Sequence, residues 1–143
     1  MSSRMTTGSN HFLFDGIPVD PYDGTPGAPF VAATTYYIPI PFSAGLVTSI
    51  QISSDGTALA TATVQHTDMP RNLDGTAINP RVAGLGHMWV TDAAFGTLTI
   101  AASTGPTGTD RRTFSNQPRR QSRLVLVIGG TGGRIVGAAN GLA

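Results

Sequence analysis

The chain contains neither lysine nor glutamate in 143 residues, and this constrains its fold more than any other feature of the sequence. Both residue types are good helix formers and are common on helix surfaces. Threonine, valine and isoleucine, which favour strands, are abundant instead. The 18 glycines and 10 prolines interrupt the chain throughout. The composition therefore predicts an all-β fold of many short strands joined by turns.

The length supports a single domain with one core. We expect a β-sandwich, or a jelly-roll-like arrangement, over residues 34–143 and an extended N-terminal arm over residues 1–33. The arm carries aromatic side chains that a disordered linker would lack, and these are candidate partner-binding residues: Phe12, Phe14, Tyr22 and Phe30. The arm could equally lie across its own core or across a neighbouring subunit. If it binds a neighbour, deletion of residues 1–30 should weaken binding and leave the β core folded.

Alternation of apolar and polar residues predicts three strands in the first half of the domain. Residues 34–41 contain two prolines, which confine that strand to the edge of a sheet. Residues 46–53 place threonine and isoleucine on one face, and serine and glutamine on the other. Residues 57–66 place small alanines on the buried face, which implies a close approach of two sheets. The sequence Ser-Asp-Gly at 54–56 predicts a hairpin between the last two strands.

The second half of the domain is less regular. Residues 67–86 form a loop that is long for a compact domain, and such loops are usually functional or interface segments. Residues 104–122 are predicted to be irregular. Further strands are expected at four places: residues 87–91, 97–103, 123–128 and 134–138. The glycine-rich residues 129–133 predict a second hairpin, between the last two of these strands.

The same glycine-rich segment looks like the phosphate-binding turn of a dinucleotide-binding fold. That fold requires a Gly-x-Gly-x-x-Gly spacing, a following helix and an acidic residue about twenty positions later. The glycines miss this spacing, and no acidic residue follows Asp110. A turn between two strands is the better interpretation, and we expect no nucleotide cofactor.

The remaining polar residues yield no catalytic or metal-binding set. The three histidines lie far apart in the sequence, and His66 with Asp68 supplies fewer ligands than a metal usually needs. No serine lies in a Gly-x-Ser-x-Gly motif, and the chain has no cysteine. The aspartates fall where turns are expected. The sequence thus predicts a protein that is not an enzyme and that binds no metal or cofactor.

Charge gives little reason to expect nucleic acid or a membrane as the partner. The net charge is +1, and no run of about 18 apolar residues occurs. The polar N-terminus predicts that there is no signal peptide. A charged fraction of only 12% suits a surface that is packed among other proteins.

Five arginines lie close together in the sequence near the C-terminal third of the chain. Four of them are candidate partner-binding residues, Arg111, Arg112, Arg119 and Arg120, and the fifth is Arg123. Arginine binds phosphate, but aromatic side chains for base stacking are limited there to Phe114. Pairing with acidic groups of a protein partner or a neighbouring subunit is therefore the favoured interpretation, with nucleic acid and a solvated loop as alternatives.

Several stretches carry a resemblance to a known class of proteins. They are Ser49-Ile50-Gln51-Ile52-Ser53, the segment 61–68, the isolated Trp89, and the segment 123–127 with its glycine turn and the final strand ending at 138–141. In pattern the chain resembles small virion proteins of tailed bacteriophages, particularly capsid decoration (cement) proteins. The resemblance covers residues 46–143 and implies an all-β knob, often trimeric. It implies a location on the capsid surface of the virion, binding to the major capsid protein without catalysis, and synthesis in the host cytoplasm.

Two other functions remain open from the sequence. A receptor- or glycan-binding sandwich of a head or tail fibre would need exposed aromatic residues in its loops. Glycan binding by the isolated protein would favour this function. A head–tail completion protein would be present in few copies per particle rather than in hundreds.

Overall fold

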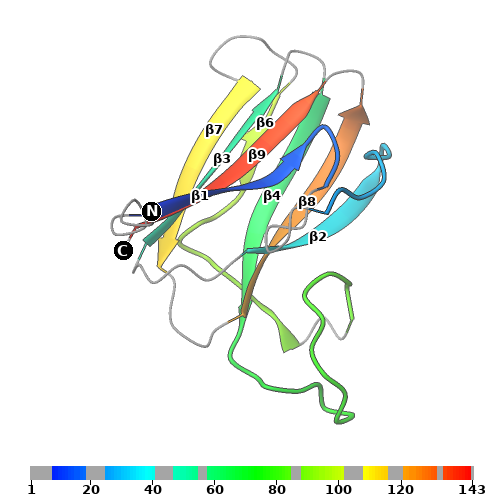
Figure 1. Cartoon of the computed structure of the whole chain (residues 1–143), viewed down its shortest axis with the longest axis vertical. Coiled ribbons are helices and arrows are strands. Elements are labelled where there is room, and N and C mark those ends of the chain that lie inside the picture. Colours follow the sequence, from blue (N-terminus) through cyan, green and yellow to red (C-terminus); the bar gives the residue numbers. More distant parts are fainter. Residues whose placement is uncertain are drawn as a thin grey trace.

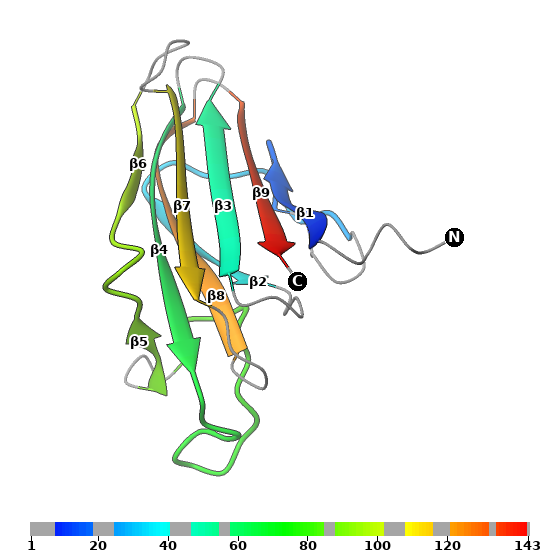
Figure 2. The ribbon, with the colours of Figure 1, turned by 90° about the vertical axis from the view of Figure 1, so that its left-hand side faces the viewer.

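The computed structural model is an all-β sandwich, which confirms the predicted fold class. It describes residues 8–18, 25–40, 47–54, 58–84, 88–101, 108–115, 121–131 and 134–142. Two antiparallel sheets pack against each other, with β7, β3, β9 and β1 to the left and β4, β8 and β2 to the right in Figure 1. In Figure 2 the four-stranded sheet lies in front of the other one. No helix long and apolar enough to cross a membrane occurs among the described residues.

One sheet has four strands in the order β1-β9-β3-β7. Their bounds are β1 (Gly8–Asp15), β9 (Ile135–Leu142), β3 (Val47–Ser54) and β7 (Thr109–Ser115). The strand β7 lies in the stretch that was predicted to be irregular, and that prediction was wrong. Its sequence, TDRRTFS, has an apolar residue only at Phe114 because it is an edge strand whose other side chains are largely exposed.

The other sheet has the order β2-β8-β4-β5, and β6 also pairs with β4. Its strands are β2 (Thr34–Ile40), β8 (Gln121–Thr131), β4 (Ala58–Thr67), β5 (Val90–Thr91) and β6 (Leu98–Ile100). Among the described strands, β2 pairs only with β8, as its prolines predicted. Pro39 is therefore tolerated, because an edge strand needs ladder hydrogen bonds on one side only.

Both predicted hairpins were wrong. The strands β3 and β4, which flank the Ser-Asp-Gly sequence, belong to different sheets, and so do β8 and β9, which flank the end of the glycine-rich segment. Each connection crosses from one layer of the sandwich to the other. A glycine turn reverses the chain, but it does not decide whether the next strand pairs within the sheet or packs across the core.

The core lies between the sheets and follows the predicted alternation. Ile50 and Ile52 of β3 are fully buried, and Ala60, Ala62 and Val64 of β4 are nearly so. Each fully buried aliphatic side chain contributes about 1.5–3 kcal/mol relative to exposure. Ala60 and Ala62 are buried where the sequence placed them, and their small side chains leave room for the facing sheet.

The N-terminal boundary differs from the expected arm. Residues 8–15 pair with β9 over the length of the strand, so they are part of the sandwich rather than an extension of it. A β-bulge between Phe12 and Phe14 places Leu13 and Phe14 together in the core, both with no exposed surface. Phe30 then packs edge-on between Phe14 and Tyr36, with ring centroids 5.6 and 4.9 Å apart. The described part of residues 1–33 therefore closes over its own core.

Candidate functional site

The solvent face of the four-stranded sheet is the candidate functional site. Directly paired residues on neighbouring strands point to the same side of a sheet. Phe12 pairs with Ala138, Ala138 with Gln51, and Gln51 with Arg111. These four residues form one row across the face, which we call the Phe12–Arg111 row. Strands lie about 4.8 Å apart, so the two ends of the row are separated by about 14 Å.

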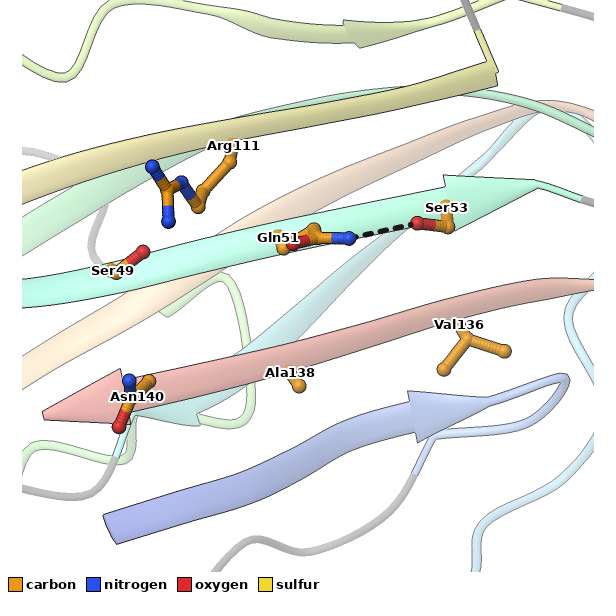
Figure 3. Close-up of a pocket in the computed structure, with 7 residues that line it drawn as sticks. All are labelled: Ser49, Gln51, Ser53, Arg111, Val136, Ala138 and Asn140. Carbon is orange, nitrogen blue, oxygen red and sulfur yellow. Dashed lines mark hydrogen bonds between the residues drawn. The ribbon is translucent and has the colours of Figure 1, made fainter. Parts of the chain in front are cut away.

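The middle of the row opens into a shallow hollow with a volume of about 310 Å³ (Figure 3). The hollow is lined by side chains from three strands: Ser49, Gln51 and Ser53 of β3, Arg111 of β7, and Val136, Ala138 and Asn140 of β9. Serine and alanine leave it shallow because their side chains are short. The arrangement is a nearly flat surface of small residues, with a long cationic side chain on one side and an aromatic ring at the far edge.

Hydrogen bonds hold the floor of the hollow in place. The hydroxyls of Ser53 and Thr109 lie 2.6 Å apart, and Thr109 also donates to the carbonyl oxygen of Ile52 at 3.2 Å. The amide nitrogen of Gln51 donates to Ser53 Oγ at 3.3 Å. This chain of bonds engages the nitrogen of the Gln51 amide.

Arg111 supplies the charge of the face. Figure 3 shows its side chain lying between β7 and β3, with the guanidinium on the side of Ser49. Within the described part of the chain, the guanidinium has no hydrogen-bond acceptor or carboxylate, although the backbone N–H of Arg111 donates to Asp110. A guanidinium presents five donors in a planar fork that matches a carboxylate or two carbonyl oxygens. The face can therefore bind acceptor groups of a partner.

The structure separates the residues that the sequence grouped as partner-binding. Phe12, with 58% of its side chain exposed, and Arg111 lie on the same face. Phe14 is fully buried in the core and is not presented to a partner, whereas Phe30 is half-buried against it. Arg112 points to the other side of the sheet, where it donates to Phe95 O at 3.2 Å and lies 3.4 Å from Asp110. The remaining three predictions, Tyr22, Arg119 and Arg120, fall outside the described residues.

The fifth arginine of the sequence cluster, Arg123, has a structural role. It has 1% of its surface exposed, and its guanidinium lies between the rings of Trp89 and Tyr37, at 4.0 and 4.4 Å from their centroids. Its Nε donates to Gln65 Oε1 at 2.8 Å and its Nη1 to Val82 O at 2.6 Å. Burial lowers the pKa of Arg123, and the nearby Tyr37 opposes that shift. An arginine nonetheless stays protonated at neutral pH. Its hydrogen bond to Val82 O ties the connection between β4 and β5 to the outer face of the five-stranded sheet. The rings of Trp89 and Tyr37 thus form an aromatic cage around Arg123. Trp89 was predicted to be a core strand residue, but it lies outside the strands.

A buried network of serine, histidine and aspartate lies on the inner side of the same sheet. His66 Nδ1 lies 2.7 Å from Ser122 Oγ, and His66 Nε2 lies 2.7 Å from Asp92 Oδ2. The carboxylate bonded to His66 is thus that of Asp92, a residue that the sequence spacing did not single out. Ser122 is only 4% exposed and lies within a regular strand, unlike a nucleophile on a sharp turn that faces substrate. The network joins β4, β8 and the turn after β5, and its polar groups satisfy one another.

Asp92 is the anchor of that network. Burial alone would raise its pKa, but the hydrogen bond with His66 and those from the backbone N–H groups of Phe95 and Ala94 outweigh burial and lower the pKa below its usual value. Asp92 Oδ1 accepts the Phe95 N–H at 2.9 Å. Among the described residues, no group of three or more potential ligands could hold a metal ion.

Comparisons with known proteins do not identify a family for this chain. No protein family and no characterised protein matches the sequence. A solved structure with some likeness is titled "Structure of infectious bursal disease virus Gx strain", with 13% identity and a TM-score of 0.14. The alignment covers 95% of this chain and 35% of that one, so the chain spans about a third of that protein's length. A likeness this weak carries no argument about function.

Proposed function

We propose that the chain is a non-enzymatic structural protein that binds the surface of a larger protein assembly through the Phe12–Arg111 row. The observation that carries this proposal is the composition of the row. Aromatic residues and arginine are enriched at the energetic centres of protein interfaces. Here one of each projects from an exposed sheet face, and Ala138 and Gln51 lie between them in the row.

The sparse charge of the chain supports a protein partner over a nucleic acid. With nine basic and eight acidic residues, the chain has no excess of cations to track a phosphate backbone. One guanidinium without a carboxylate on the described surface instead matches an acidic side chain or backbone carbonyls of a partner. The flat face suits a broad contact rather than the enclosure of a small molecule.

The resemblance to decoration proteins gives this binding role a specific form. We propose that the partner is the major capsid protein of a tailed bacteriophage and that the chain sits on the outside of the shell across junctions between capsomers. A clamp that binds only the assembled shell stabilises it by mass action. Several clamps joined as an oligomer add avidity.

A second function is favoured by the polar lining of the hollow, where Gln51, Asn140 and Arg111 offer donors and acceptors to sugar hydroxyls. In that case the chain would be the glycan-binding sandwich of a fibre. Phe12 lies at the edge of the face rather than over the hollow, so the described site lacks the central aromatic platform that would stack a sugar ring. Protein binding is therefore the preferred proposal.

The test is binding of the purified chain to shells that lack it, measured by co-sedimentation across a concentration series. The variants Phe12→Ser and Arg111→Ala should each weaken binding by roughly thirtyfold, about 2 kcal/mol, as interface centres do. The matched control is Val31→Ser, which removes another side chain that is 60% exposed. Equal binding by all four proteins would overturn the proposed face, and binding to a glycan array with no binding to shells would favour the fibre function.

A further inference from the structure

One end of the hollow on the four-stranded sheet brings together hydrogen-bond donors from three strands. Ser49 of β3 pairs directly with Asn140 of β9, so their side chains point to the same side of the sheet. The guanidinium of Arg111, which comes from β7, lies on the side of Ser49 (Figure 3). All three side chains line the hollow. We call Ser49, Arg111 and Asn140 the donor cluster.

The donors of this cluster are not used within the described part of the chain. There, no hydrogen bond or ion pair engages the Ser49 hydroxyl, the Arg111 guanidinium or the Asn140 amide. A guanidinium carries five N–H donors, an amide group two and a hydroxyl one. The hydroxyl and the amide can also accept hydrogen bonds, but the guanidinium can only donate. A group that fits the cluster must therefore bring acceptor atoms for Arg111.

Polar side chains at the other end of the hollow are already engaged with one another. Thr109 donates its hydroxyl hydrogen to the carbonyl oxygen of Ile52, so Ser53 must be the donor in the 2.6 Å contact between Ser53 Oγ and Thr109 Oγ1. Ser53 Oγ in turn accepts a hydrogen bond from the amide nitrogen of Gln51. A ligand at this end would have to break bonds that these groups already make. The donor cluster is therefore the part of the hollow that can take up a polar group.

The donor cluster carries a positive charge that no described carboxylate balances. Among the described residues that line the hollow, Arg111 alone is ionisable. The neighbouring Asp110 lies 3.4 Å from Arg112, which points to the other side of the sheet. Asp15 of β1, which borders the far end of the hollow, accepts a hydrogen bond from Arg134. Both nearby carboxylates thus have a cationic partner already, and an anion from outside is the group that matches Arg111.

The spacing and the charge of the cluster favour a carboxylate among possible anions. Arg111 and Asn140 lie on strands on either side of β3, about 10 Å apart across the sheet, and leave room for a small planar group over Ser49. A carboxylate accepts two parallel N–H bonds from a guanidinium and keeps lone pairs for a hydroxyl and an amide. Its single charge matches the single guanidinium. A phosphate monoester carries a charge of about −2 at neutral pH, of which one guanidinium balances only half.

We infer that the donor cluster binds one carboxylate, and that an aspartate or glutamate side chain of the protein partner supplies it. This inference rests on the proposed function, and it narrows the acceptor that Arg111 meets from any oxygen to a carboxylate. It also defines what the partner must present, which is an acidic side chain at this end of the Phe12–Arg111 row and an apolar site at the other. An exposed charge pair is weak on its own, so a single carboxylate should bind with millimolar affinity.

A titration of the isotope-labelled full chain, followed by nuclear magnetic resonance near neutral pH, tests the inference. The probe is the peptide acetyl-Ala-Glu-Ala-amide, which carries one carboxylate and no other charge, and its counterpart is acetyl-Ala-Gln-Ala-amide. The glutamate peptide should shift the side-chain N–H signals of Arg111 and Asn140 in a saturable way. The glutamine peptide should bind roughly tenfold more weakly or less, because it offers no charged acceptor. Sodium chloride at the same ionic strength should not reproduce the shifts.

Three variants with the same change in net charge locate the binding. Arg111→Gln should abolish the saturable shifts. Asn140→Asp should also abolish them, because it places a carboxylate of the chain itself beside the guanidinium. The matched control is Arg71→Gln, at an exposed arginine of the loop after β4, and it should bind the glutamate peptide like wild type. Circular dichroism confirms that each variant is folded, and Arg111→Lys, which keeps the charge but loses the planar fork, replaces Arg111→Gln if that variant is not.

The outcomes separate this inference from the proposed function. Wild type without saturable shifts, equal binding of the two peptides, or full binding by Arg111→Gln would each overturn the carboxylate site, even if the chain binds shells. Peptide binding by a chain that does not bind shells would keep the carboxylate site and overturn the proposed partner. Tighter binding of sodium glucuronate than of the glutamate peptide would assign the site to an acidic glycan and overturn the protein source.

Discussion

Gly137 and Phe14 offer a sharp test of how β1 is joined to the sandwich. The two residues are paired across β1 and β9. A Cβ atom built on Gly137 would lie 2.2, 2.5 and 2.8 Å from three atoms of the Phe14 ring. All three distances are shorter than a carbon–carbon contact, and the ring is fully buried with Phe30 packed against it. The Gly137→Ala substitution therefore requires the ring or the strand to move.

The expected cost follows from two opposing effects. Overpacking of a well-packed core costs about 1–3 kcal/mol and occasionally more. Replacement of glycine by alanine within a strand would otherwise stabilise the fold by about 0.5–1 kcal/mol, because glycine loses more chain entropy on folding. Because three atoms of a rigid ring are too close, we take the overpacking cost at the upper end of its range, about 3 kcal/mol, against a gain of about 1 kcal/mol. We expect a net loss of about 2 kcal/mol, which lowers the melting temperature by roughly 5–10 °C for a chain of this length.

Urea unfolding measures this loss, with Gly129→Ala as the matched control. Gly129 is also a strand glycine, but it is exposed and its Cβ would approach only Leu59, at 3.3 Å, so the change there should be within about 0.5 kcal/mol. Adding Phe14→Leu to Gly137→Ala should recover part of the loss, so the double variant is more stable than the sum of the single changes predicts. A Gly137→Ala protein as stable as wild type, or strictly additive effects, would refute the packing of Phe14 against Gly137.

Three further predictions concern other parts of the fold. The substitution Arg123→Lys should lower the free energy of unfolding by about 2–3 kcal/mol and shift Trp89 fluorescence to longer wavelength. The reason is that lysine cannot stack between two rings while donating to three carbonyl groups. An unchanged spectrum and an unchanged stability would contradict the aromatic cage around Arg123. Because the pKa of Asp92 is lowered in the folded state, its stabilising effect is complete above the unfolded pKa of about 3.9 and is lost as the pH falls through the folded pKa. Urea unfolding from pH 2 to pH 7 should show this loss in wild type and a weaker pH dependence in Asp92→Asn, whereas parallel curves would argue against it. Deletion of residues 1–15 should abolish cooperative unfolding rather than only weaken binding, and a truncated protein with wild-type near-ultraviolet dichroism would show that β1 is dispensable.

The sequence was sufficient to predict which faces of the strands are buried. Thr48, Ile50 and Ile52 face the core because apolar residues recur at every second position, and that periodicity is a local property of the chain. The edge position of β2 followed from Pro39 in the same way, because a proline lacks the hydrogen-bond donor that a central strand needs.

Features that depend on distant parts of the chain were not predictable from local patterns. The Phe12/Phe14 bulge buries two consecutive residues of β1, which breaks the alternation that identifies a strand. The edge strand β7 carries Arg111 and Arg112 in its middle, so it looks like a polar loop. Charges on an edge strand discourage pairing with other chains, and this requirement overrides strand propensity.

The candidate site was predictable in its chemistry but not in its arrangement. Phe12 and Arg111 were chosen because aromatic and arginine side chains favour protein contacts. Nothing local places them on the same face, because they are brought together by the order β1-β9-β3-β7, whose members are far apart in sequence. Gln51 was assigned to the polar face of its strand, yet its place in the row follows only from the pairing of β3 with both β7 and β9.

The proposed shell-binding role requires that a tailed phage encode the chain, and the protein composition of gradient-purified particles of such a phage tests that role most directly. Quantitative mass spectrometry should find the chain in a number of copies comparable to the major capsid protein. Treatment that strips it from the shell should leave particles that rebind the wild-type chain but not the Phe12→Ser and Arg111→Ala variants. A few copies per particle would contradict the account and place the protein at the tail or portal, and absence from the particles would remove the structural role altogether.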